Sequence, residues 1–228
     1  MLIIRPLIVF FSVAAWLLLQ PWCQAQPPVV DGLVVQLDVV GLAQESNSPS
    51  VDSWKNGVAA QEFSSGGDAS ETPQLVKVGD SFVVRFDGDD VLRCVGNRVA
   101  PNSSMSVFVV AAPHENLGDF RGIVAANAPG RRDYESGFNM DLGPAPTGKL
   151  DNLNMEGAGF GGAADLLDAS FDFGTLHVFS AIISADSETI ALRVDGKLTG
   201  QRAYEPTSIS LEQLTLGARY YTNGQGEQ

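Results

Sequence analysis

The segment Thr189-Ile190-Ala191-Leu192-Arg193-Val194-Asp195-Gly196-Lys197-Leu198 is the clearest indication of the fold class. Ile190, Leu192 and Val194 occupy alternate positions, with less apolar residues between them. Successive side chains of a strand point to opposite faces, so the alternation predicts a half-buried β-strand. The pair Asp195-Gly196 predicts a tight turn directly after it, because glycine accepts positive φ.

Eight further runs have the same character, being short, alternating or β-branched, and bounded by Gly, Asp, Asn or Pro. They are Leu33 to Val39, Phe82 to Phe86, Met105 to Ala112, Gly122 to Ala126, Tyr134 to Leu142, Leu150 to Glu156, Leu176 to Ser184 and Leu211 to Ala218. Met105 to Ala112 becomes continuously apolar, which predicts a central strand covered on both faces. Only Ala163 to Ala169 suggests a helical turn. Nine strands predict an all-β domain of two packed sheets.

The composition excludes several functional classes. The 228 residues carry a formal charge of −13, which opposes binding to nucleic acid or to anionic membrane surfaces. Two cysteines and two histidines provide neither a disulfide scaffold nor zinc-ligand spacing. The fold must therefore rest on the burial of apolar side chains.

The amino-terminal 25 residues resemble a secretory signal peptide. Arg5 precedes an apolar stretch from Leu7 to Leu19, and a short polar run ends at Ala25. The stretch is shorter than the roughly 20 residues that a permanent membrane span requires. We expect cleavage after Ala25, an exported chain without stable membrane insertion, a linker at 26–31 and one domain at 32–228. An uncleaved anchor is the alternative.

Three ordered motifs resemble landmarks of the concanavalin A-like lectin/glucanase (laminin G-like) jelly-roll domains of bacterial secreted proteins. They are Gly32-Leu33-Val34-Val35-Gln36-Leu37-Asp38, Val51-Asp52-Ser53-Trp54-Lys55-Asn56-Gly57 and Val84-Arg85-Phe86-Asp87-Gly88-Asp89-Asp90. Later segments, among them Leu214-Thr215-Leu216-Gly217-Ala218-Arg219, are similar too. The resemblance implies a two-sheet antiparallel jelly-roll sandwich that binds carbohydrate or protein, or that serves as a module attached to an enzyme.

The carboxyl end departs from that family pattern. The family usually continues past the Leu-Gly-Ala-Arg segment into one more apolar strand, whereas this sequence ends at Gly224-Gln225-Gly226-Glu227-Gln228. Without that strand, Leu33 to Val39 would be an unpaired apolar edge. We therefore hypothesise a jelly roll that lacks its last strand and is a fragment of a longer protein.

Candidate catalytic residues are few. The sandwich glycosidases of this superfamily carry paired carboxylates on alternate positions of a strand. Asp133-Tyr134-Glu135 is the nearest approach, but it lacks a third acid and follows two arginines. His114 and His177 have no nucleophile placed nearby in the sequence, and we expect both to be structural. Cys94 lies in a strand-like run and is expected to be buried.

Two segments are candidates for binding. Asp89 and Asp90 could provide oxygen ligands to Ca²⁺, although a turn stabilised by aspartate side chains is the favoured interpretation. Tyr220, Tyr221 and Asn223 could bind a sugar at the rim by ring stacking and hydrogen bonds, although one tyrosine packed in the core and capped by the other is the favoured interpretation. The glycine-rich run Gly157 to Ala164 is expected to be a mobile rim loop, and Trp54 a core residue or loop anchor.

The sequence as a whole predicts a secreted, non-enzymatic recognition module that binds a glycan or a cell-surface partner, with Ca²⁺ as an optional cofactor. One alternative is a structural or interaction module of a larger exported protein, with no small ligand of its own. The other is a glycoside hydrolase.

Overall fold

The computed structural model describes residues 31–45, 48–67, 69–222 and 225–227. The chain divides into Met1–Leu33 and Val34–Gln228, and the second unit contains every helix and strand of the described residues. The expected signal peptide and Asn223 lie outside the described residues. None of the described helices is long and apolar enough to cross a membrane.

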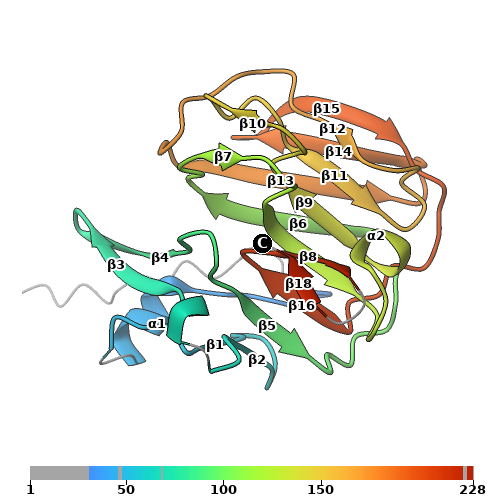
Figure 1. Cartoon of the computed structure of the whole chain (residues 1–228). Coiled ribbons are helices and arrows are strands. Elements are labelled where there is room, and N and C mark those ends of the chain that lie inside the picture. The colour runs from blue at the N-terminus through green and yellow to red at the C-terminus, as the bar shows by residue number, and fades with distance from the viewer. Residues whose placement is uncertain (1–30, 46–47, 68, 223–224, 228) are drawn as a thin grey trace, which may run out of the picture. The chain divides into compact units, whose positions relative to one another are not determined.

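The unit Val34–Gln228 is built on two antiparallel sheets (Figure 1), which confirms the all-β sandwich. The larger sheet has eight strands, in the order β1 (Ser53–Lys55), β2 (Glu62–Ser64), β5 (Leu92–Val95), β16 (Gln213–Leu216), β8 (Gly122–Asn127), β9 (Phe138–Asp141), β11 (Asn154–Gly157) and β12 (Ala164–Asp165). The smaller sheet has four, in the order β15 (Lys197–Ala203), β14 (Thr189–Val194), β13 (His177–Ser184) and β6 (Met105–Ala111).

Three antiparallel strand pairs and three short helical segments complete the described structure. The pairs join β3 (Gln74–Val78) to β4 (Ser81–Arg85), β7 (Asn116–Leu117) to β10 (Pro146–Thr147), and β17 (Arg219–Thr222) to β18 (Gln225–Glu227). The helical segments are α1 (Val39–Glu45), the 3-10 turn Ala69–Glu71 and α2 (Asp133–Ser136).

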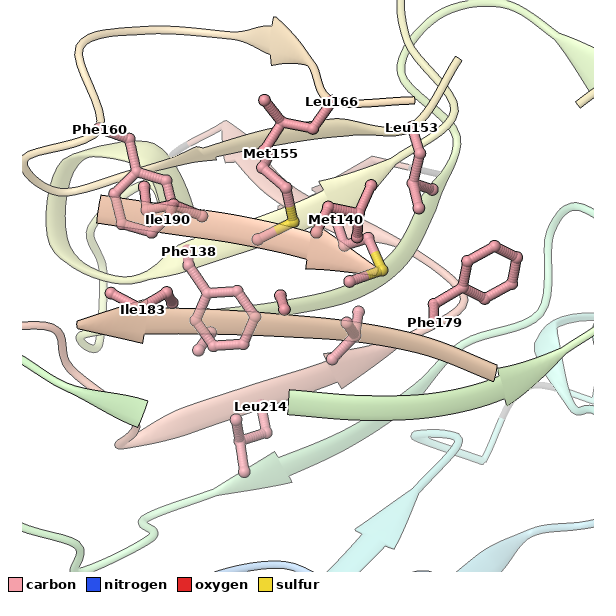
Figure 2. Close-up of a cluster of buried hydrophobic side chains, with 14 of the residues drawn as sticks. Phe138, Met140, Leu153, Met155, Phe160, Leu166, Phe179, Ile183, Ile190 and Leu214 are labelled. Atoms are coloured by element: carbon pink, nitrogen blue, oxygen red, sulfur yellow. The ribbon is translucent and has the colours of Figure 1, made fainter. Parts of the chain in front are cut away.

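A single apolar core contains side chains from both sheets (Figure 2). Phe138 and Met140 of β9 and Met155 of β11 are buried from the larger sheet, and Phe179 and Ile183 of β13 from the smaller one. Complete burial of a side chain of this size contributes roughly 1.5–3 kcal/mol, so this layer is the main source of stability. Cys94 is free and buried in the same core, as expected.

The segment from Thr189 to Leu198 folds as predicted. Strand β14 covers Thr189–Val194, and its pattern alternates between buried and half-buried residues. Asp195 and Gly196 then both adopt positive φ, of 51° and 80°. The Asp195 carboxylate accepts a hydrogen bond from the Val178 amide, which fixes the turn against the neighbouring strand.

The predicted strand from Leu33 to Val39 is wrong. Residues 34–38 join no sheet. The side chain of Asn56 accepts from the Gln36 amide and donates to the Val34 carbonyl oxygen, and the Gly57 amide donates to the Gln36 carbonyl oxygen. Helix α1 then begins at Val39, with the Asp38 carboxylate accepting from the Val40 amide as a cap. Residues 34–38 are therefore not the unpaired apolar strand edge that the sequence predicts.

Three other local predictions are also wrong. Strand β6 is an edge strand and is not covered on both faces: Phe108 is 69% exposed and Val110 63% exposed. The suggested helical turn at 163–169 is instead the short strand β12. The predicted strand from Tyr134 to Leu142 is divided into α2 and β9 at Gly137, where an added Cβ would collide with the Ala126 carbonyl of β8.

Candidate functional site: a buried ion cluster beneath a tyrosine platform

The outer face of the larger sheet is polar and covered. Phe138 and Met140 of β9 point into the core, while Asn139 and Asp141 alternate to the other face, and all four are buried. Helix α2 and strand β17 provide the cover, since their residues bond to these side chains. Gly122 in β8 permits the close approach of the chain entering β17, because a Cβ there would collide with the backbone of Ala218.

Arg219 is the centre of this covered region. It is 2% exposed, and its guanidinium contacts three carboxylates from three elements. The contacts with Asp133 of α2 are 3.3 Å from Nε and 3.1 Å from Nη2. Nη1 lies 3.2 Å from Asp141 of β9, and Nη2 donates to Glu156 of β11 at 2.8 Å. This ion cluster, Arg219 with Asp133, Asp141 and Glu156, fixes β17 to the sheet.

Asp133 has further hydrogen bonds that hold it in place. Its carboxylate accepts from the backbone amides of Tyr134, at 2.6 Å, and Tyr220, at 2.9 Å. It also accepts from the side-chain amide of Asn139 at 3.2 Å. Asp133 therefore joins α2, β9 and β17 at one buried point, as a buried charge with several partners.

The cluster contains more negative than positive charge, with one guanidinium and three carboxylates. Burial raises the pKa of Asp141 to about 6, although Arg219, Asn154 and the Gly143 amide act in the opposite direction. Burial also disfavours the charged form of Arg219, but its bonds to Asp133 and the nearby carboxylates outweigh this and raise its pKa above the ordinary value. Near neutral pH the cluster can therefore take up a proton at Asp141 while Arg219 stays charged.

Two tyrosines and an arginine form a surface patch above the cluster, which we call the tyrosine platform: Tyr221 is exposed, and Tyr134 and Arg132 are half-buried. The two rings lie 5.6 Å apart at 46°. The Arg132 guanidinium lies 5.6 Å from the ring centre of Tyr134 and 5.9 Å from that of Tyr221. Its Nη1 atom donates to the Tyr134 hydroxyl. The platform presents aromatic surface and polar groups together.

The platform and the buried cluster are in direct contact. The Arg219 guanidinium lies 5.5 Å from the Tyr221 ring centre and 5.3 Å from that of Phe120. Phe120 and its neighbour Asp119 both have positive φ, near 55°, a conformation that costs a non-glycine residue free energy. Their amides donate to the carbonyl oxygens of Gly143 and Pro144, which hold this loop against the site.

The structure separates the two tyrosines predicted for the rim. Tyr220 is buried, at 8% exposure, whereas Tyr221 is 42% exposed and belongs to the platform. Asn223 lies outside the described residues, so its predicted role stays a prediction. Sequence reasoning missed Arg132 and Tyr134 as partners of Tyr221, and it missed the whole ion cluster.

The acidic loop at residues 87–90 has features of both a calcium site and a turn stabilised by aspartate side chains. Carboxylate oxygens of Asp87, Asp89 and Asp90 lie within 4.8 Å of one another. Asp90 is buried and accepts from the Asp87 amide at 2.8 Å, as the favoured turn requires. Arg121 donates to the Gly88 carbonyl oxygen and so places a guanidinium at the same loop. The calcium site at Asp89 and Asp90 stays a prediction.

The acidic pair Asp133 and Glu135 does not form the arrangement considered for a hydrolase. Both residues lie on α2 and not on a strand; Asp133 is buried against Arg219, while Glu135 is exposed beside Arg132 at 3.5 Å. His177 is hydrogen-bonded and packed, which agrees with the expected structural role: its Nδ1 lies 2.8 Å from Asp195, and its ring packs against Phe171.

The glycine-rich run is anchored, which corrects its interpretation as a mobile loop. Phe160 is 1% exposed and packs edge-on against Tyr204. The Gly159 carbonyl oxygen accepts from the Glu205 amide, and a Cβ on Gly159 would collide with the Glu205 carbonyl. Beside this run the surface is hollowed by a shallow depression of about 590 Å³, lined in part by Arg202 and Glu188.

Comparisons with known proteins find distant structural likeness only. No protein-family model matches the chain, and no curated protein sequence matches it. Domain 4 of AbnA, a GH43 extracellular arabinanase from Geobacillus stearothermophilus, solved with arabinotriose, is 10% identical; the match covers 68% of this chain and 70% of that one, at a TM-score of 0.45. The carbohydrate-binding module CBM66 from Bacillus subtilis is 11% identical. That match covers 68% of this chain and 92% of the module, at a TM-score of 0.37. At these scores the likeness assigns neither a family nor a ligand.

Proposed function

We propose that this chain is an exported, non-enzymatic recognition module that binds a glycan at the tyrosine platform. The observation that carries the proposal is the exposed ring of Tyr221 beside Tyr134, with hydroxyl and guanidinium groups at the ring edges. Sugar rings present apolar C–H faces and polar hydroxyl edges. An amphipathic aromatic side chain with adjacent hydrogen-bonding groups matches both.

The ion cluster supports binding in preference to hydrolysis. A glycosidase places two carboxyl groups on either side of the scissile bond. Here Asp133 and Asp141 are fully buried and bonded to Arg219, and the Glu156 side chain is only 15% exposed. These carboxylates position the platform through β17 and α2, and we assign them no contact with the ligand.

The experiment that tests the proposal is a glycan-binding screen with wild-type protein and Tyr221→Ala, followed by calorimetry on each glycan that binds. The expected result is an at least tenfold loss of affinity in the variant, equivalent to about 1.4 kcal/mol. Phe108→Ala, which removes an exposed ring from the smaller sheet, is the matched control and should retain full affinity. Unchanged binding by Tyr221→Ala would overturn the platform as the site.

The non-enzymatic part of the proposal has its own assay. Each glycan that binds is incubated with the wild-type protein, and the release of reducing sugar is measured. We expect no release. Release that is abolished by Glu135→Gln or by Glu156→Gln would instead identify a hydrolase.

A second candidate function rests on a different surface. Five apolar residues are exposed on the outer side of the smaller sheet, namely Phe108, Val110, Val178, Ile182 and Leu198. Apolar patches of this kind mark contact sites for other proteins. This observation favours an interaction module of a larger exported protein, or one that binds a cell-surface partner.

A further inference from the structure

We propose that the glycan bound at the tyrosine platform is acidic, carrying a carboxylate or sulfate group that pairs with Arg132. This inference rests on the proposed function, because it names the chemical class of ligand for the same site. It follows from the position of Arg132, from its present partner and from its contrast with Arg219.

Arg132 is the accessible cation of the platform. Its side chain is 39% exposed, and the residue before it, Arg131, is exposed as well. The chain has only 14 lysines and arginines against 27 acidic residues, so two consecutive arginines, one exposed and one half-buried, form a local exception to its negative charge. An anionic group reaching this edge of the platform would therefore meet positive charge.

The guanidinium of Arg132 is already oriented. It lies against the rings of both tyrosines and donates to the Tyr134 hydroxyl, which also helps to raise its pKa above the ordinary value. A guanidinium packed on aromatic faces retains N–H donors at its edge, and their forked geometry matches a carboxylate or sulfate. The same rings would pack against the sugar that carries the anion.

Glu135 occupies the position that the ligand's anion would take. Its carboxylate lies 3.5 Å from Arg132, and its side chain is 40% exposed. An ion pair this exposed contributes at most about 1 kcal/mol, so a ligand anion can replace it. Arg219 offers no such opportunity, because it is buried and bonded to three carboxylates of the chain itself.

The negative net charge of the chain restricts where an acidic glycan can bind. A formal charge of −13 repels anions from most of the surface, so non-specific capture of an acidic glycan is disfavoured. Binding must then come from a local site where an arginine and apolar rings act together. Short oligosaccharides are the appropriate probes, because they experience less of the long-range repulsion than polymers do.

The test compares matched acidic and neutral probes: trigalacturonic acid with its methyl ester, and sulfated with unsulfated dextran oligosaccharides. Calorimetry on the wild-type protein should give at least tenfold tighter binding for one acid over its neutral partner. Arg132→Gln should abolish that preference, and Arg132→Lys should retain part of it. Glu135→Gln should strengthen acid binding two- to fivefold, because the competing carboxylate is gone.

The outcomes separate the inference from the proposed function. Equal binding of acidic and neutral probes, weakened by Tyr221→Ala, overturns the acidic ligand and leaves glycan recognition standing. Acid binding that Arg132→Gln leaves unchanged also overturns the inference. Binding of no probe, acidic or neutral, in this set and in the glycan screen overturns both. Thermal melting of each variant checks that the fold is retained.

Discussion

Arg219 compensates two carboxylates that have no access to water, those of Asp133 and Asp141. Removing one partner of a buried ion pair leaves uncompensated charge in a medium of low polarity, which costs about 3–5 kcal/mol. We therefore expect Arg219→Met to lower the free energy of unfolding by this amount in urea denaturation. Lys197→Met, at an exposed position, should change it little. A loss of less than about 1 kcal/mol in Arg219→Met would contradict the assigned role.

Asp141 makes stability depend on pH in an unusual direction. Its pKa in the folded protein is about 6, above the value of 3.8 in the unfolded chain, so the folded state binds more protons between these two pH values. Its contribution to stability therefore increases as the pH falls from above 6 toward 4, by roughly 1–3 kcal/mol. The measurement is urea unfolding from pH 7.5 to 4.5 for the wild type and Asp141→Asn.

The difference between those two proteins isolates this group from the other carboxylates. The free energy of unfolding of Asp141→Asn, minus that of the wild type, should be largest at pH 7.5 and should decrease as the pH falls. A difference that stays constant with pH would show that Asp141 does not take up a proton in this range.

At the residue scale, sequence reasoning succeeds where the signal is local. For Tyr220-Tyr221 the favoured interpretation is one ring in the core capped by the other; the structure buries Tyr220, as this requires, but leaves Tyr221 42% exposed. The partners of Arg219 could not be found this way: Asp133 and Glu156 lie 86 and 63 positions away. Only the larger sheet's strand order and the path of β17 bring them together, and no spacing rule predicts either.

At the scale of elements, too, local patterns are predictable and contacts between distant segments are not. Strands such as β14, with clean alternation and a turn pair, are predictable. Val35 and Leu37 of the segment 34–38 also pack against the core, yet this segment joins no sheet, and the side chain of Asn56 bonds two of its backbone groups. The apolar residues of the segment are therefore predictable from the sequence, whereas its hydrogen-bond partners are decided by tertiary structure.

Asn56 provides the test of that explanation. Asn56→Ala leaves the Gln36 amide and the Val34 carbonyl without their partners and should lower the free energy of unfolding by about 1–3 kcal/mol. Hydrogen exchange should show faster exchange at the Gln36 amide than in the wild type. Asn102→Ala, which removes only an exposed bond to the Ser104 amide, is the control. Unchanged exchange at Gln36 would mean that Asn56 does not hold this segment.

At the scale of the whole unit, the two candidate functions use different sheets and should be separable. The tyrosine platform lies over the larger sheet, while the exposed apolar residues belong to the smaller one, with Phe108 and Val110 on its edge strand β6. Such an edge is a template for association with another chain. Replacing both residues by threonine places β-branched side chains, which strands favour, at these positions and removes most of the apolar surface.

We therefore expect the double variant Phe108→Thr/Val110→Thr to retain its glycan affinity and, within about 1 kcal/mol, its stability. It should bind less of a dye that reports exposed apolar surface, and it should lose any association with a partner that the wild type captures through β6. Loss of glycan binding in the folded variant would show that the two faces are one site. Because Tyr221→Ala should have the opposite profile, the pair of variants assigns each activity to one sheet.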